Sequence, residues 1–276
     1  MAQVVDMSVH CDFSKVAFRV FGLPIYWYAL AYIAGILSAL HLGKVYLKKT
    51  HSTIAPEKLD IFINYAVVGI VMGGRLGHVL FYNFAYYCDN PLEIFQIWHG
   101  GMSFFGGFAG VVLVAYFFCK KHHIDMLEFT DLWSVGAPIG LFLGRLANFV
   151  NGELVGKASS VAWGVVFSDG IQRHPSQIYE AFLEGIVLFA VMIISFHRRS
   201  YELCGKLSGI FCGTYGVLRF VAEFFREPDS NFSQLLLHKT AINFNQYICV
   251  GIFILGYVVV GMHRRLKPPT MRVTES

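Results

Sequence analysis

Three arginines stand inside otherwise apolar stretches of the chain, where a charged side chain needs a partner or a function. They are Arg75, Arg145 and Arg219. Placing an arginine in lipid costs at least about 2.5 to 3.5 kcal/mol on insertion scales. Because a guanidinium group can donate two parallel hydrogen bonds to phosphate oxygens, the three residues predict a binding site for an anionic, phosphate-bearing ligand.

One of these arginines has a partner nearby in the sequence. Tyr215, Arg219 and Glu223 are spaced four residues apart, which places them on one stripe of a helix, so Arg219 and Glu223 are expected to pair. A purely structural ion pair is the alternative for these two residues. With one or two acids near three arginines, we expect a local excess of positive charge.

The other two arginines have no carboxylate at helical spacing within their own apolar stretch. For Arg145 the nearest polar groups are Asn148 and the turn at 151–153, so we expect its own helix end to satisfy it in part. Arg75 has only His78 nearby in the sequence. We therefore expect Arg75 to meet a carboxylate from another helix or an anionic ligand.

The composition excludes a water-soluble enzyme. Of the 276 residues, 55% are hydrophobic and only 14% are charged, and the mean hydropathy is +0.54. The formal net charge of +4 is small and the basic residues are scattered among loops, so no nucleic-acid partner is expected. The eleven histidines are dispersed and no Cys/His spacing fits zinc, so we expect neither a metal nor another cofactor.

Seven apolar stretches approach the roughly 20 residues that a membrane-spanning helix needs. We therefore predict an all-α, polytopic membrane protein with about seven transmembrane helices. Residues 1–276 are expected to form a single membrane-embedded domain with a small external insertion at about 155–178. The predicted spans are 24–45, 61–82, 104–119, 132–149, 181–196, 207–225 and 243–262.

The distribution of Lys and Arg predicts the orientation of the spans. With the N-terminus outside and the C-terminus inside, 13 of these residues fall on the cytoplasmic side and 6 on the external side, as the positive-inside rule requires. The three arginines then lie roughly 20 Å into a hydrocarbon layer of about 30 Å, measured from the cytoplasmic side. Tyr28 and Ser103 fall near the same level, so the polar groups gather towards the outer leaflet.

Glycines recur at four-residue spacing in or beside three predicted spans, and such rows let helix backbones approach closely. The rows are Gly69, Gly73 and Gly77; Gly136, Gly140 and Gly144; and Gly205, Gly209 and Gly213. We expect close helix packing at these positions. A pore lined by glycine is the alternative, but no other residues support it.

Two functions compete when the residues are taken alone. The first is an enzyme that binds an anionic lipid through its arginines and acts on the headgroup, with Tyr28, Glu153, His174 and Glu223 available for proton transfer. The second is a transporter or flippase, in which the arginines form a station for the anion. A transporter is expected to place its site near the midplane and to show internal repeats, so arginines near one face favour the enzyme.

Five sequence motifs sharpen this choice. The most distinctive is GRLANFVNGELVG at 144–156. The others are GGRLGHVLFYN (73–83), GGMSF with a following GG (100–107), RHPSQIYEAFLEG (173–185) and YGVLRFVAEFFREPD (215–229). In their order and residues they resemble the signatures of the bacterial prolipoprotein diacylglyceryl transferases, and the resemblance covers most of 26–229. Seven spans with the N-terminus outside also agree with that family.

The resemblance implies a reaction, its partners and a location. In the family, the diacylglyceryl group of phosphatidylglycerol moves to the lipobox cysteine thiol of a prolipoprotein, which forms a thioether and releases glycerol phosphate. The implied partners are phosphatidylglycerol, the prolipoprotein signal peptide with its lipobox, and membrane lipid. The implied location is the bacterial cytoplasmic (inner) membrane, with the active site toward the periplasmic leaflet and lateral entry of the lipid.

The resemblance also carries functional residues onto matching positions of the motifs. Arg145 and Arg219 match the essential arginines of the family, and Asn148 and Gly156 belong to its signature. The expected catalytic residues are Arg145, Arg219, Tyr28, Glu153, Glu223 and His174. The expected substrate-binding residues are Arg145, Asn148, Gly156, Tyr215, Arg75, Arg226 and Ser103.

The chain departs from the family pattern at one position. The family carries a histidine after GGMSF, proposed as the base that takes the thiol proton, whereas this sequence has Phe105. Either that histidine is dispensable as a base, or Glu153, His174 or His99 substitutes for it, or the chain is a weakened enzyme. We expect catalysis to rest mainly on the arginines, with the base unassigned.

Restoring the histidine tests this expectation. We predict that Phe105→His changes the rate of transfer by less than about tenfold, because the arginines stabilise the leaving phosphate whether or not a histidine is present. The measurement is the initial rate of glycerol phosphate release from phosphatidylglycerol with a lipobox peptide. A gain of about 10²-fold or more, as a positioned general base supplies, would instead show that a base is missing.

Overall fold

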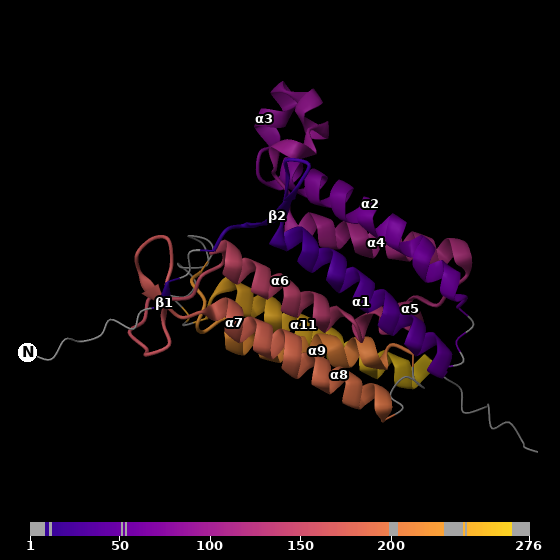
Figure 1. Cartoon of the computed structure of the whole chain (residues 1–276). Coiled ribbons are helices and arrows are strands. Elements are labelled where there is room, and N and C mark those ends of the chain that lie inside the picture. The colour runs from indigo at the N-terminus through magenta and orange to yellow at the C-terminus, as the bar shows by residue number, and fades with distance from the viewer. Residues whose placement is uncertain are drawn as a thin grey trace, which may run out of the picture. The chain divides into compact units, whose positions relative to one another are not determined.

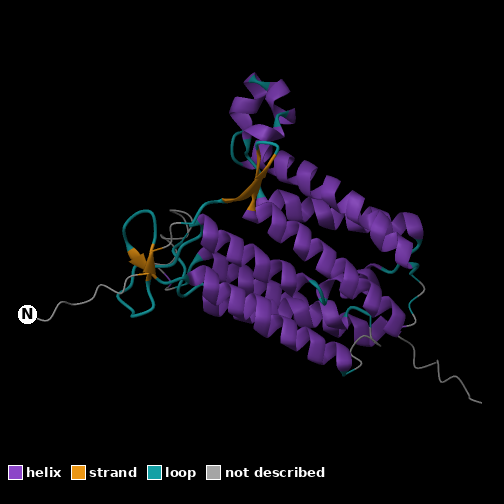
Figure 2. Cartoon of the chain, in the orientation of Figure 1, coloured by secondary structure: helices purple, strands orange, loops and turns teal. Residues whose placement is uncertain are grey.

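The structure is a computed structural model that describes residues 9–10, 13–50, 52, 54–198, 204–228, 240 and 242–266. Most of these residues are helical, and the strands form two small sheets (Figure 2). The chain divides into two compact units. Unit 1 comprises Met1–Gly43 and Thr130–Ser276, and unit 2 comprises Lys44–Phe129.

Two helices run across the boundary between the units, α1 (Trp27–Thr50) and α5 (Met126–Ser134). The remaining helices of unit 1 are α6 (Ala137–Asn151), α7 (Ser176–Glu180), the π-helical segment η3 (Ala181–Val187), α8 (Leu188–His197), α9 (Lys206–Ala222) and α11 (Phe244–Leu266). Those of unit 2 are α2 (Pro56–Phe81), α3 (Phe84–Asp89), the 3₁₀ turns η1 (Pro91–Phe95) and η2 (Ile97–His99), and α4 (Phe104–His122) (Figure 1).

Both small sheets belong to unit 1. Strands β2 (Val16–Val20) and β3 (Leu23–Tyr26) form an antiparallel hairpin, and its two-residue turn, Phe21 and Gly22, has positive φ at both positions, as a type I′ turn requires. In the other sheet β4 (Val165–Val166) lies between β1 (Val9–His10), which is parallel to it, and β5 (Gln172–Arg173), which is antiparallel.

All seven predicted apolar stretches contain helix, but the stretch 132–149 is interrupted. Helix α5 ends at Ser134 and α6 begins at Ala137, with Pro138 in its first turn. A proline has no N–H to continue the helix and clashes with the carbonyl four residues earlier, whereas the first turn of a new helix accepts it. The short length of several predicted spans favours tilt or interruption, and Pro138 is the sequence signal for the interruption here.

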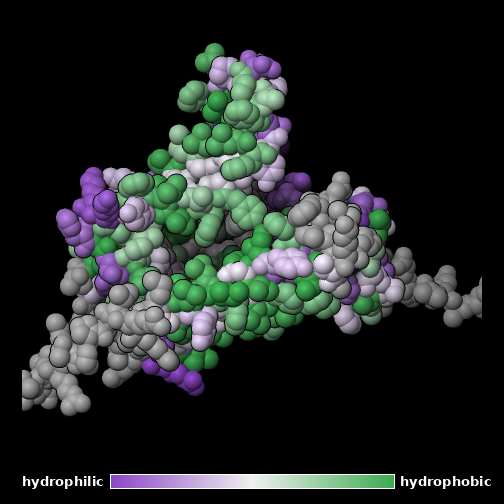
Figure 3. Space-filling view, turned by 180° about the vertical axis from the view of Figure 1, so that it is seen from behind, coloured by the Kyte–Doolittle hydropathy of each residue, from purple (hydrophilic) through white to green (hydrophobic). Residues whose placement is uncertain are grey.

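Four helices of the described chain are long and apolar enough to cross a membrane: Trp27–Thr50, Pro56–Phe81, Ser176–His197 and Phe244–Gly261. Figure 3 shows one face of the molecule, where most of the described surface is hydrophobic. Exposed side chains on α2 include Val68, Met72 and Leu80, which fits a helix surface in contact with lipid. These findings support a membrane protein. Helices α6 and α9, with 15 and 17 residues, are shorter than a full span.

Each glycine row includes a position where helix backbones approach closely, as predicted, although nothing lies within 4 Å of a Cβ placed on Gly144. In unit 2 a Cβ added to Gly73 of α2 would lie 2.9 Å from the Cα of Gly110 in α4. In unit 1 a Cβ on Gly136 would lie 2.5 Å from the Cα of Ala39 in α1, and Gly209 of α9 faces α11 in the same way. Real Cβ atoms do not approach backbone this closely, so these contacts need glycine.

Substitution of one packed glycine tests this reading. Gly73→Ala is expected to lower the free energy of unfolding by about 1 to 3 kcal/mol, because α2 and α4 must separate to accept the methyl group. The measurement is the thermal unfolding midpoint in detergent. Gly251→Ala is the control, since nothing lies within 4 Å of a Cβ at that position. Equal midpoints for the two variants would contradict close packing at Gly73.

Candidate functional site

Six charged side chains meet between α6, α7, η3 and the C-terminal end of α9, and we call them the Arg–Glu cluster. The members are Arg145, Glu180, Glu184, Arg219, Glu223 and Arg226. Glu180 lies at the centre of the network: its carboxylate is 2.9 Å from Arg145 Nε, 2.6 Å from Arg219 Nη1 and 3.4 Å from Arg226 Nη1.

The cluster is buried and its formal charges cancel. All three glutamate side chains are fully buried, and the arginine side chains are between 5% and 16% exposed. Three guanidinium groups therefore face three carboxylates. The expected excess of positive charge is wrong for this cluster, because Glu180 and Glu184 supply two carboxylates that we had not counted.

Arg145 is the most exposed arginine of the cluster, with 16% of its side chain accessible. Its contacts with the described residues use Nε, which meets Glu180, and Nη2, which lies 3.2 Å from Glu184 Oε2. Nη1 makes no hydrogen bond or ion pair with a described residue. The expectation that Asn148 and the turn at 151–153 satisfy Arg145 is wrong, since its partners come from α7 and η3.

The predicted pair of Arg219 and Glu223 is confirmed, at 2.6 Å between Nη2 and Oε2. Two amides that precede or begin α11 also donate to Glu223 Oε1: Asn243 Nδ2 at 3.1 Å and Asn245 Nδ2 at 2.9 Å. A fully buried carboxylate that pairs with Arg219 through Oε2 and accepts two amide hydrogen bonds at Oε1 is poorly placed to take a proton from a substrate. The contacts fit a residue that holds Arg219.

The two predicted tyrosines differ in their relation to the Arg–Glu cluster. Tyr215 lies beside it, and Tyr28 contacts Tyr32. Tyr215 is near enough to Arg145, Arg219 and Glu184 for electrostatic interaction. Tyr28 packs on Tyr32 with ring centroids 4.9 Å apart and hydroxyl oxygens 3.4 Å apart. Because Arg145 also interacts electrostatically with Tyr32, this tyrosine pair connects α1 to the arginines.

Gly156 and His174 lie together outside the cluster. A Cβ on Gly156 would overlap the carbonyl oxygen of His174 and come 2.8 Å from that of Phe225, so this glycine lets three segments meet. His174 Nδ1 is 3.2 Å from the Tyr179 hydroxyl, which accepts a 2.6 Å hydrogen bond from Trp163 Nε1. Tyr179 therefore links Trp163 to His174 through its hydroxyl group.

Glu153 has the most exposed carboxylate among the predicted site residues, with 46% of its side chain accessible. Its carboxylate is 3.7 Å from Lys15 Nζ and 3.4 Å from Asn151 Nδ2. Gln177 Nε2 donates to its backbone carbonyl at 2.7 Å. Asn148 is buried in the last turns of α6. Both residues therefore lie near the end of the helix that carries Arg145.

A second arginine network lies in the loops beside Gly156. Arg173 contacts Glu227 at 3.0 Å and Asp169 at 2.8 Å, and it donates to the Gly156 carbonyl. The backbone N–H of Ile171 and the Arg173 guanidinium hold the pKa of the exposed Asp169 carboxyl below its ordinary value. This network is more exposed than the Arg–Glu cluster and shares no described ion pair with it.

Arg75 belongs to unit 2 and is surrounded by backbone carbonyls. Its guanidinium donates to the carbonyls of Glu93 (2.5 Å), Ile94 (2.8 Å), Gly100 (2.6 Å) and Gly101 (3.2 Å). Its side chain is buried and packs over the ring of Tyr87. No carboxylate of a described residue pairs with Arg75, so that part of the expectation is wrong. Through its four hydrogen bonds Arg75 instead organises the segment from η1 to the residues just before α4.

Ser103 has a local role in the same unit. Its hydroxyl accepts a hydrogen bond from the Gly106 N–H and caps α4, as serine commonly does. Phe105 follows in the first turn of α4 and is 60% exposed. The side chain of His99, the proposed substitute for the missing histidine, lies outside the described residues.

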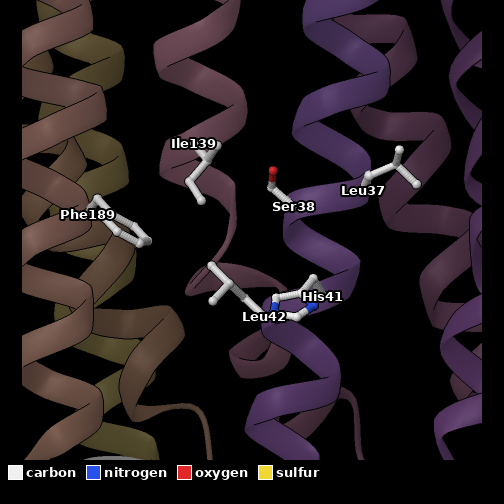
Figure 4. A pocket seen from close by; sticks show the side chains of 6 residues that line it. All are labelled: Leu37, Ser38, His41, Leu42, Ile139 and Phe189. Carbon is white, nitrogen blue, oxygen red and sulfur yellow. The ribbon is translucent and has the colours of Figure 1, made fainter.

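An apolar groove of about 360 Å³ opens between α1, α6 and α8 in unit 1 (Figure 4). Its lining residues are Leu37, Ser38, His41, Leu42, Ile139 and Phe189. Ile139 precedes Arg145 by six residues on α6, which is about 9 Å along the axis. The residues that line the groove are mostly apolar and include no Lys or Arg.

The decisive residues that the sequence analysis missed are Glu180 and Glu184. They are four residues apart in the motif RHPSQIYEAFLEG, on an apolar helix, and that spacing could have predicted two buried carboxylates on one face. Within the described residues, no group of three or more His, Cys, Asp or Glu side chains is arranged to hold a metal ion.

Comparison with known proteins adds independent findings. The model of the family "Prolipoprotein diacylglyceryl transferase" matches residues 15–262. A phosphatidylglycerol–prolipoprotein diacylglyceryl transferase of Azospirillum brasilense is 44% identical over 255 residues, 91% of this chain and 94% of the relative. The protein of the same name from Rickettsia rickettsii (strain Sheila Smith) is 42% identical over 252 residues, 90% and 96% of the two chains.

The role of Arg75 gives a test that is independent of catalysis. Arg75→Lys is expected to increase protease cleavage within 83–103 at least tenfold, because an ammonium group has three donors and no planar fork with which to hold four carbonyls. The measurement is limited chymotrypsin digestion, with the fragments identified by mass spectrometry. Arg19→Lys is the control, since Arg19 contacts one carbonyl at 3.4 Å. Unchanged cleavage would contradict the organising role.

Proposed function

The chain belongs to the prolipoprotein diacylglyceryl transferase family, and on that premise we propose that its Arg–Glu cluster binds the phosphate of phosphatidylglycerol during diacylglyceryl transfer. The acceptor is the lipobox cysteine thiol of a prolipoprotein signal peptide. A bond forms between the cysteine sulfur and the glyceryl carbon, the carbon–oxygen bond to phosphate breaks, and glycerol phosphate leaves. The thiol proton passes to a base.

The observation that carries the proposal is the open edge of Arg145. Nη1 is not used by a described residue, whereas Nε and Nη2 are fixed by Glu180 and Glu184. A donor that is fixed before the substrate arrives stabilises developing charge without reorganisation. The phosphate of phosphatidylglycerol carries one negative charge and the departing phosphomonoester gains a second, so the contact strengthens as the bond breaks.

The neighbouring residues support this arrangement in different ways. We assign Arg219 to the phosphate site together with Arg145, and Glu223 to the placement of Arg219. Tyr215 and Tyr28 are assigned to the substrate surface around the arginines, with Asn148 at the end of α6. We assign a structural role to the remaining predicted residues, because their contacts are with backbone atoms or with a glutamate of the cluster. These residues are Gly156, Arg226, Arg75 and Ser103.

For the thiol proton we propose Glu153 as the acceptor. Its carboxylate is exposed and its contacts with Lys15 and Asn151 are long, at 3.7 Å and 3.4 Å, so a lone pair is available. Glu223 is fully buried and paired with Arg219, and His174 Nδ1 lies 3.2 Å from the Tyr179 hydroxyl. Glu153 therefore fits the role of the histidine that Phe105 replaces better than the other two residues do.

We further propose a topology of seven spans in the bacterial inner membrane, with the N-terminus outside and the C-terminus inside. The bias of Lys and Arg toward one side supports this orientation, and four helices support the spanning architecture. In this topology 155–178 is a small periplasmic insertion and the phosphate site faces the periplasmic leaflet, where prolipoprotein signal peptides and phosphatidylglycerol meet.

The test is diacylglyceryl transfer by the purified protein in detergent, with phosphatidylglycerol and a lipobox peptide. We expect release of glycerol phosphate that depends on the peptide cysteine and is lost with a Cys→Ala peptide. Release without the cysteine, or no release from a folded protein, would contradict the proposed reaction. Movement of lipid between leaflets of a vesicle without transfer would favour the flippase.

Arg145→Lys removes the planar guanidinium of Arg145 and keeps its positive charge. We expect kcat to fall by about 10² to 10³-fold, as for loss of one preorganised donor, while the fold is retained because the positive charge remains beside Glu180. Size exclusion and circular dichroism report the fold. Arg198→Lys, an exposed arginine at the end of α8, is the matched control. Wild-type kcat for Arg145→Lys would contradict the role of the fork.

A further inference from the structure

Glu184 joins two arginines with its two carboxylate oxygens. Oε2 lies 3.2 Å from Arg145 Nη2, and Oε1 lies 3.2 Å from Arg219 Nη1. The side chain is fully buried. The carboxylate is therefore a bridge between α6 and α9, contributed by η3, and it touches both arginines that the proposed function places at the lipid phosphate.

We propose that Glu184 is a positioning residue, which holds the Arg145 guanidinium in the one orientation that directs its free Nη1 edge at the substrate phosphate. The inference rests on the proposed function and extends it to a residue that the reaction itself does not use. Glu184 neither touches the substrate nor exchanges a proton. It acts through Arg145.

Planarity of the guanidinium makes this role possible. Glu180 forms an ion pair with Arg145 at Nε, whereas Glu184 accepts a directional hydrogen bond from Nη2. These two contacts lie along one edge of the planar guanidinium, so together they orient its opposite edge, and Glu184 supplies the directional part. Without Glu184, Arg145 keeps one carboxylate contact, between Nε and Glu180. The guanidinium plane can then rotate about that single contact. Arg219 keeps Glu180 and Glu223 at 2.6 Å each, so the loss falls mainly on Arg145.

The backbone around Glu184 is built to hold it in place. The residue lies in a π-helical segment, η3, and π-turns within helices are frequent at functional sites. The next residue, Gly185, packs against α6 so closely that an added Cβ would lie 2.6 Å from Phe142 Cβ. Phe142 is three residues before Arg145, so this contact fixes η3 and α6 at the level of the Glu184 bridge.

A simpler role for Glu184 is neutralisation of charge. In that case any carboxylate at this position would serve, whatever its reach. Positioning requires the full length of the glutamate, because both arginines are contacted at 3.2 Å and aspartate is shorter by one methylene group. The aspartate substitution therefore distinguishes the two roles, because it keeps the charge and loses the reach. The glutamine substitution is expected to lose activity in either role, because it removes the charge and its Nε2 cannot accept a hydrogen bond from the second arginine.

The experiment measures kcat, KM for phosphatidylglycerol and the unfolding midpoint for Glu184→Asp and Glu184→Gln. Both variants are expected to lose at least tenfold in kcat, because a small misplacement of a group that binds the transition state is costly. KM is expected to change less than threefold. Glu184→Asp should keep a wild-type unfolding midpoint, since the buried charges still cancel.

The matched control is Glu227→Gln, which removes a carboxylate paired with Arg173 outside the cluster and should keep wild-type kcat. Wild-type kcat for Glu184→Asp would overturn positioning and leave charge balance as the role. An unchanged kcat with a raised KM would also overturn it, because the bridge would then serve lipid binding alone. If the wild-type protein shows no cysteine-dependent release of glycerol phosphate, the proposed function itself fails, and this outcome is distinct from the two above.

Discussion

A guanidinium group stays ionised even when it is buried, so a buried arginine needs acceptors. In the Arg–Glu cluster of unit 1 these acceptors are carboxylates. Glu180 satisfies this constraint for three arginines at once, and it does so from a helix that packs between α6 and α9. Removing one member of a buried ion pair typically costs about 3 to 5 kcal/mol. The positions of α6, α7 and α9 therefore depend on this carboxylate, and the chemistry of the site depends on those positions.

Close backbone packing and ion pairing act together. A carboxylate can bridge arginines on two other helices only if the three helices lie near one another, and Gly185 of η3 allows that approach at Phe142 of α6. The result is a neutral, rigid array in which the outer edge of Arg145 remains open.

The sequence predicted the contacts that are local and missed those that depend on packing. The pair of Arg219 and Glu223 follows from helical spacing, and the glycine rows follow from their four-residue repeat. Glu180 and Glu184 were visible as an i, i+4 pair, but no local rule says that their helix faces Arg145. The carbonyl partners of Arg75 could not be predicted at all, because they depend on the irregular backbone between η1 and α4.

In the proposed function the open edge of Arg145 receives the lipid phosphate. An experimental structure of the full chain with phosphatidylglycerol bound would test this contact. We expect a phosphate oxygen within about 3.2 Å of Arg145 Nη1, with Glu180 and Glu184 still in contact with Nε and Nη2. A headgroup bound instead to the Arg173 network or beside Arg75, with the Arg145 edge unoccupied, would contradict it.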